Sequence, residues 1–366
     1  MESRLLQALE RSDLPGASAE AGRIDATSAW DVHLSLFPFV QRVQNPPFIN
    51  PHLPKMYRII RELASCLQQD EIAALVRLEI IEYTRRPKLG QIPRPARWPS
   101  QVSFADVKSA ILQQDIQGTA ALLAAFAARE GGTELIRRML LLGSGYIGQS
   151  LGHSISCSAF ILLEMLERKD QDFWPAVAAL ADYFCKGRFG TTPELRQGQG
   201  AADARISGQL LRAASGQGIV NLHHMITLYA IEQVRDFFAI EEFNHLIESW
   251  ITFLGDKQPE TYEPKSSGLK ISGYEQFYPI FSRLEEDAVV ASALPMIVQD
   301  EERKRLGRYL VKGICDLYQG DYNPHYLTGL GSTLWALDKY RNRPEIGANV
   351  LRQFLIFYFE SLKEKY

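Results

Sequence analysis

The sequence contains 366 residues, 46% of them hydrophobic and 23% charged, with a formal net charge of −3. A chain of this length and apolar content can bury a sizeable core in one large domain or two ordinary ones, and its weak charge argues against nucleic-acid binding, which usually needs a concentrated basic face. The four cysteines lack the close pairing of a disulfide framework or a metal-binding CxxC motif. Residues 1–11 lack the apolar core of a signal peptide. The longest apolar run, residues 120–128, is too short to cross a bilayer. We expect a globular, soluble, cytoplasmic protein with neither nucleic-acid nor membrane partners.

Residues 1–30 are expected to form an N-terminal segment ahead of a helical domain that spans residues 31–366. Within this domain a helix-entry signature recurs four times, as Asn50-Pro51-His52, Gly152-His153, Asn221-Leu222-His223-His224 and Asn323-Pro324-His325. Asn is a preferred N-cap and Pro is favoured at the first helical position, so each signature predicts a histidine in the first turn of a helix.

An apolar helical run follows each signature, then a polar break and a second amphipathic helix. Each unit therefore predicts a helical hairpin of about 40 residues. His52 and His153 are 101 residues apart (153 − 52), and His223 and His325 are 102 apart (325 − 223), which favours an internal duplication into halves 31–190 and 205–366. The sequence predicts an all-α protein in which repeated helical hairpins form a single curved or ring-like domain.

The segments between these hairpins are rich in proline, glycine and polar residues. Residues 85–99 combine arginine with proline and predict an irregular solvated loop. The glycines of residues 143–148 have the spacing of a dinucleotide fingerprint, but they follow a charged helical run instead of a strand, so we expect close helix approach or a hinge ahead of His153. Residues 187–208 and 255–273 predict two long loops.

The repeated histidines are the main functional candidates. A histidine at the positive end of a helix dipole is disfavoured in its protonated form, and neutral imidazole is the form that binds metals. If the hairpins surround an axis, His52, His153, His223, His224 and His325 can supply three or four ligands, with a free position for oxygen or substrate. The alternative is a structural role, in which each imidazole bonds a neighbouring loop carbonyl. The sequence leaves open which of His223 and His224 points inward, and His33 and His245 lie outside the repeated register.

Other polar residues follow the histidines by one or two helical turns. Tyr229, Tyr326 and Thr328 are candidates for catalytic groups that orient substrate or donate a proton, and Lys55 lies at a similar spacing. The alternative for the tyrosines is half-buried packing. Glu164 and Glu232 are the candidate carboxylates, either as a ligand or base or as solvated helix charges.

Two segments resemble a known family. Residues 153–160, His-Ser-Ile-Ser-Cys-Ser-Ala-Phe, and residues 178–184, Ala-Ala-Leu-Ala-Asp-Tyr-Phe, are similar to the His-rich helix and its aromatic-ended partner in the questin oxidase-like family, oxygenases of aromatic polyketide pathways that open anthraquinone-type rings. The helix starts at His223 and His325 resemble that family's His-x-x-Thr or His-x-x-Lys starts. Phe160 stands where the family has a second histidine, and Thr328 where a lysine is common.

This resemblance covers most of the chain and implies a mostly helical enzyme that binds a flat polycyclic substrate over a metal-centred or otherwise oxygen-activating pocket. It implies ligand roles for His52, His153, His223 or His224, and His325. We expect a metal-dependent oxygenase that acts on an aromatic polyketide-like small molecule with O₂ and non-haem iron (Fe²⁺), although another divalent transition metal is compatible with the ligands. The alternatives are a non-catalytic α-helical repeat protein that binds a partner, and a metal-free enzyme with histidine as acid or base.

Overall fold

The computed structural model describes residues 2–168, 172–196, 198, 200–265, 268–320 and 323–364. The described part of the chain is built from α-helices and one 3-10 helix, with no strand, so the predicted all-α class is confirmed. None of its helices is long and apolar enough to cross a membrane. The helices are α1 (Glu2–Glu10), α2 (Leu14–Ala21), α3 (Ala29–Ser35), α4 (Phe37–Val40), α5 (His52–Ala64), α6 (Gln69–Arg85), α7 (Phe104–Leu112), α8 (Ile116–Glu130), α9 (Gly132–Ser144), α10 (His153–Glu167), α11 (Trp174–Gly187), α12 (Ala202–Ala214), α13 (Gly218–Gln233), η1 (Arg235–Phe237), α14 (Ile240–Leu254), α15 (Tyr274–Phe281), α16 (Glu286–Ile297), α17 (Asp300–Asp316), α18 (His325–Lys339) and α19 (Pro344–Lys363).

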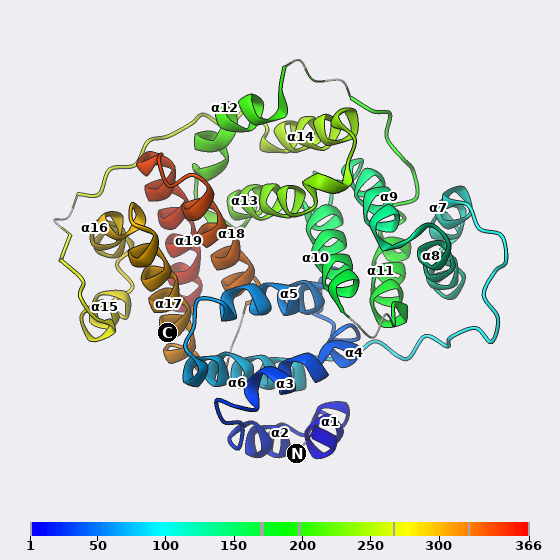
Figure 1. The fold of residues 1–366 in the computed structure, drawn as a ribbon, viewed down its shortest axis with the longest axis horizontal. Coiled ribbons are helices and arrows are strands. Elements are labelled where there is room, and N and C mark those ends of the chain that lie inside the picture. The colour runs from blue at the N-terminus through cyan, green and yellow to red at the C-terminus, as the bar shows by residue number, and fades with distance from the viewer. Residues whose placement is uncertain are drawn as a thin grey trace.

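Four helices, α5, α10, α13 and α18, form a closed inner ring (Figure 1). Helix α5 packs against α10, α10 against α13, α13 against α18, and α18 against α5 again. Each inner helix also contacts the next α-helix in the chain, α6, α11, α14 and α19 respectively, which lies on its outer side (Figure 1). The N-terminal helices α1 and α2 pack against α6. This arrangement brings four segments that are far apart in sequence around one axis.

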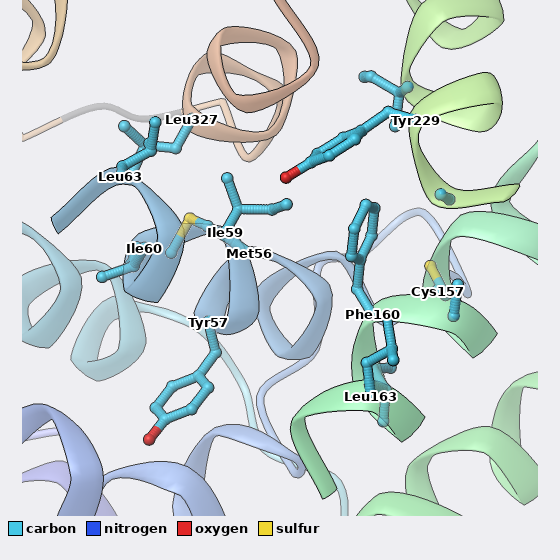
Figure 2. Close-up of a cluster of buried hydrophobic side chains, with 14 of the residues drawn as sticks. Met56, Tyr57, Ile59, Ile60, Leu63, Cys157, Phe160, Leu163, Tyr229 and Leu327 are labelled. Carbon is cyan, nitrogen blue, oxygen red and sulfur yellow. The ribbon is translucent and has the colours of Figure 1, made fainter. Parts of the chain in front are cut away.

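Apolar side chains fill the interior of this ring. Figure 2 shows Ile59 of α5, Phe160 of α10 and Tyr229 of α13 pointing toward one another. The rings of Phe160 and Tyr229 are 5.1 Å apart between centroids, and neither residue is more than 3% exposed. Phe160 occupies the position where the family resemblance suggested a second histidine, and here it packs in the hydrophobic core.

Two glycines set the start of α10. A Cβ atom at Gly143 would lie 2.6 Å from the Ser154 carbonyl oxygen, so only glycine permits this close approach of α9 and α10. Gly152 has φ = +75°, in the left-handed region that favours glycine, and a Cβ atom there would overlap the Thr227 hydroxyl. The chain can therefore turn directly before His153 and pack α10 closely on both α9 and α13.

Helix starts agree with the signatures at three of the four histidines. His52, His153 and His325 are the first residues of α5, α10 and α18, each after a Pro or Gly at the N-cap. The prediction for His223 is wrong, because α13 begins at Gly218 and His223 is its sixth residue. The predicted irregular segment 85–99 begins at the last residue of α6 and otherwise lies between α6 and α7. Residues 255–273 separate α14 from α15, whereas the predicted loop 187–208 starts at the last residue of α11 and already contains the start of α12 at Ala202.

Candidate metal centre

Four histidines meet at one end of the inner ring, and each comes from a different helix. The Nε2 atom of His153 lies 2.7 Å from Nε2 of His52 and 3.2 Å from Nε2 of His223. Nε2 of His223 lies 3.1 Å from Nε2 of His325. The rings of His325 and His52, 4.8 Å apart between centroids, close the circle. All four residues are at least 92% buried.

These separations suit a shared metal ion. Two nitrogen ligands at about 2.1 Å from a metal, with an angle of 90° to 110° between them, are about 3.0 to 3.4 Å apart. The His153–His223 and His223–His325 distances fall in this range. Ligand nitrogens of His52, His153 and His325 also lie within 4.8 Å of one another, close enough to hold one ion.

The opposite nitrogen of three rings is held by an oxygen acceptor. Nδ1 of His153 donates to the Ser150 carbonyl at 2.7 Å, and Nδ1 of His223 donates to the Ile219 carbonyl at 2.6 Å. Nδ1 of His325 donates to Oδ1 of Asn323 at 2.8 Å, and the same oxygen accepts from the His325 backbone N–H. Since the proton sits on Nδ1 in each ring, Nε2 presents a lone pair to the centre. Oxygen acceptors behind metal-binding histidines impose the same arrangement.

His52 has a different partner. Its Nδ1 lies 3.3 Å from the amide nitrogen of Asn45, and Arg86 donates to the amide oxygen of that residue. Arg86 thereby orients the Asn45 amide so that its N–H₂ faces His52, and Nδ1 of His52 accepts. The ring proton of His52 consequently lies on Nε2 and is donated to Nε2 of His153.

The histidines resist taking up further protons. Burial holds the pKa of His52, His153 and His325 well below the usual value near 6.5, and lowers the pKa of His223 to about 3. Lys55 and the neighbouring histidines add to this effect. All four rings are therefore neutral at physiological pH. Nε2 of His223 and Nε2 of His325 then face each other at 3.1 Å with no proton between them, a contact that a bound cation would turn from repulsive to attractive.

A pocket of about 650 Å³ reaches this cluster from the surface. Its walls combine aromatic and aliphatic side chains with asparagines, and the exposed residues Phe48, Glu360 and Glu364 belong to its lining. The volume is in the range of small-molecule sites. The pocket is lined by Asn45, Pro46, Phe48, Asn50, His52, Arg86, Leu151, His153, Gly218, Ile219, His223, Asn323, Pro324, His325, Tyr326, Phe357, Glu360, Ser361 and Glu364.

Of the two adjacent histidines, His223 lies in the cluster and His224 does not. His224 packs edge-on against Phe253 of α14, and Nδ1 of His224 lies 3.2 Å from Nζ of Lys257. Consecutive helical residues point about 100° apart, so only one of the pair can face the ring axis.

The other candidate residues occupy varied positions. Tyr326 lines the pocket and packs against Phe357. Tyr229 packs in the core between Phe160 and Trp335, and the Thr328 hydroxyl donates to the carbonyl of Pro324. Neither of these two lines the pocket.

The two carboxylates singled out in the sequence are paired away from the histidines. Glu164 accepts from Arg58 and Arg61, and Glu232 accepts from Lys339. His33 and His245 are also buried outside the cluster, where His33 bonds Glu79 and His245 bonds Ser144.

Lys55 is the most unusual neighbour of the cluster. It lies one helical turn after His52, its side chain is fully buried, and its Nζ has no hydrogen-bond partner. Burial lowers the pKa of Lys55, which favours the neutral amine. In the sequence, only the three-residue spacing from His52 indicated that Lys55 lies near the cluster. Nothing in the sequence indicated that Asn45 contacts His52 or that Ser150 contacts His153.

Comparisons with known proteins add no relative. No family model matches the chain, and neither a curated protein nor a solved structure matches it. The four histidines and their pocket are therefore the basis for inferring a function.

Proposed function

We propose that the protein is a metal-dependent oxygenase that acts on an aromatic, polyketide-like small molecule. The observation that supports a metal most directly is the contact between unprotonated Nε2 atoms of His223 and His325 at 3.1 Å. Their Nδ1 protons are committed to oxygen acceptors, and burial opposes a second proton on either ring. A cation that accepts nitrogen lone pairs resolves this contact.

The proposed ligands are Nε2 of His223 and His325, together with Nε2 of His153, whose lone pair becomes available when the metal displaces the hydrogen bond that His52 donates to it. His52 completes the circle with a distinct role. Its Nε2–H can donate to a molecule bound beside the metal, or it becomes a fourth ligand if the Asn45 amide turns over. Three neutral ligands leave the full positive charge of a divalent ion in place, and a ligand set with open positions is the arrangement that catalytic metals require.

The choice of iron and O₂ draws on the resemblance to the questin oxidase-like family. Imidazole nitrogens also bind zinc, copper and nickel, so the ligand type alone does not select iron. When bound, such an iron centre would supply the oxygen activation that the proposed reaction needs. The chain itself would hold the metal, place the substrate against it and limit the access of water.

The pocket supports a flat aromatic substrate. Phe48, Tyr326 and Phe357 give it aromatic walls, and Asn50 is a polar side chain that can orient a substrate oxygen. Its volume of about 650 Å³ can hold a three-ring molecule.

The two alternative functions explain less. A protein-binding repeat scaffold does not explain why unprotonated Nε2 atoms of several histidines meet in the interior. A metal-free enzyme with histidine as general acid or base works best with a pKa near the working pH, whereas burial pushes the pKa of these histidines far below it.

Metal analysis of purified protein tests the centre. We expect about one transition-metal ion per chain, by the ligand count of a mononuclear site, in the wild type, and its loss in His153→Ala, His223→Ala and His325→Ala. The matched control is His224→Ala, which removes a buried histidine next to His223 on the same helix and should keep the metal. Absence of metal after anaerobic reconstitution with Fe²⁺, Mn²⁺ and Zn²⁺ would refute the metal centre.

Oxygen consumption tests the reaction separately. We expect the iron-loaded protein to consume O₂ when 1,8-dihydroxyanthraquinone or a related hydroxylated polycycle is added, and the His325→Ala variant to lack this response. A metal-loaded protein that consumes no O₂ with a panel of such aromatics would leave the metal centre standing and contradict the oxygenase assignment.

A further inference from the structure

A second cavity, also about 650 Å³, lies between the N-terminal helices, the segment 89–94 and the start of α11. It shares no lining residue with the histidine pocket. Helix α11 faces it with Ala178 and Ala179, whose short side chains leave space beside α4, with which α11 is in contact. The cavity therefore has the size of a small-molecule site of its own.

The charged residues of this cavity are already paired. Arg42 donates to Glu10 at 2.6 Å through Nη1 and to the Leu89 carbonyl at 3.2 Å through Nε. Arg94 donates to Asp172 at 2.6 Å. Because these partners neutralise the charged groups, the lining favours an uncharged ligand.

Two aromatic rings contribute flat apolar surface to the same lining. Trp174 is held by a hydrogen bond of 3.3 Å from its Nε1 to the Ile92 carbonyl, and Phe39 lies on the short helix α4. The indole of Trp174, held in this way, and the ring of Phe39 provide apolar surface that a planar ligand can contact.

Gln41 is the unusual polar residue of the cavity. It is 3% exposed, and neither Oε1 nor Nε2 of its amide has a hydrogen-bond partner. A buried amide without partners is unfavourable, and native proteins rarely retain one without a reason. Gln41 lines this cavity and an adjoining one of about 210 Å³, and rotation about its flexible side-chain bonds can turn the amide toward a ligand.

We propose that this cavity binds an uncharged, flat, bicyclic molecule in which a hydrogen-bond donor stands next to an acceptor, as in a lactam. The amide of Gln41 would pair with both groups, and Phe39 and Trp174 would contact the ring faces. This site is independent of the metal centre.

The test uses two probes of the same shape. Isoquinolin-1(2H)-one carries a lactam N–H beside its carbonyl, and isocoumarin has a ring oxygen in place of that N–H. We expect isoquinolin-1(2H)-one to shift the indole N–H signal of Trp174 in NMR spectra of ¹⁵N-labelled protein, and isocoumarin to bind about tenfold more weakly, by the size of one net hydrogen bond. A Trp174 signal that does not move at the solubility limit of isoquinolin-1(2H)-one would overturn the proposal.

Variants separate recognition from folding. Gln41→Met should weaken the binding of isoquinolin-1(2H)-one by up to about a hundredfold, because it removes both hydrogen bonds to the lactam. It should also raise the Tm, because it removes a buried amide that lacks partners. The matched control is Gln353→Met, which should lower the Tm, since Nε2 of Gln353 donates to the carbonyls of Ala213 and Ser215 at 3.2 and 3.0 Å.

Two further variants locate the bound probe. Ala178→Leu should fill the cavity and abolish binding of the probe. This variant tests the site independently if Gln41→Met does not fold. His325→Ala should leave binding unchanged, because His325 belongs to the other pocket. Equal binding to the wild type, Gln41→Met and Ala178→Leu would contradict the proposal.

Discussion

Two buried histidine sites in this protein differ in how their polar groups are balanced. His33 is fully buried, but its Nδ1 lies 2.8 Å from Oε2 of Glu79, and Oε1 of Glu79 accepts from the Tyr83 hydroxyl at 2.7 Å. His33 also stacks on Tyr57. The central cluster places four imidazoles together with no carboxylate among the grouped ligands. The first site contains a carboxylate partner for its imidazole, whereas the second contains none, and we propose that a cation completes it.

The largest difference is expected in the response to acid. The unfolded histidines take up protons near pH 6.5, but the folded cluster does not, because burial lowers these pKa values. The unfolded state therefore binds more protons below pH 6.5, and the metal-free protein should lose up to about 1.4 kcal/mol per pH unit for each of the four histidines as the pH falls.

Urea unfolding of metal-free protein between pH 7.5 and 5 measures this loss, and only a small part of it should occur above pH 7. Saturation with the bound metal should raise the unfolding free energy at each pH until the ligands are protonated. A metal-free protein that is equally stable at pH 7.5 and 5 would contradict the neutral cluster.

The next largest effect is expected at the pair of His33 and Glu79. Glu79→Ala should lower the unfolding free energy by about 3–5 kcal/mol, because it leaves a buried histidine without its charged partner. Chemical denaturation measures the loss. Metal content per folded chain should not change, and a fall in metal content would show that the two sites are coupled.

A smaller effect of opposite sign is expected at Lys55. Lys55→Met removes a buried amine without a partner and conserves most of the side-chain volume, so we expect the unfolding free energy of the metal-free protein to rise by about 1–2 kcal/mol. Metal content should be retained. The matched control is Lys257→Met, because Nζ of Lys257 is bonded to the Ser215 carbonyl, Asn221 and His224 and its loss should destabilise the protein.

A loss of stability in Lys55→Met as large as that in Lys257→Met would mean that the amine of Lys55 has a partner in solution. Metal loss from Lys55→Met would place this residue among the groups that hold the ion.

The sequence predicted much of what local chemistry controls. Three helices begin at His52, His153 and His325, each directly after a Pro or a Gly. Pro restricts the backbone angle φ to a value that suits a helix start, and Gly permits the positive φ of the turn before α10. The start of α13 was missed, since the asparagine before His223 lies inside a helix that begins at Gly218.

Selection among equivalent residues needed the tertiary structure. His223 and His224 have the same chemistry and adjacent positions, and only the packing of α13 between α10 and α18 decides that His223 faces the cluster. Packing likewise places Tyr326 at the pocket and Tyr229 in the core.

The sequence by itself determined the all-helical class and the recurring histidine near a helix start, because periodicity and capping act over a few residues. The tertiary structure alone decided that four helices close into a ring and that four Nε2 atoms meet there. It also decided that Arg86, through Asn45, gives His52 a different proton position from the other three rings. These outcomes depend on contacts between residues as far as 273 positions apart along the chain (325 − 52), as between His52 and His325, which no local pattern specifies.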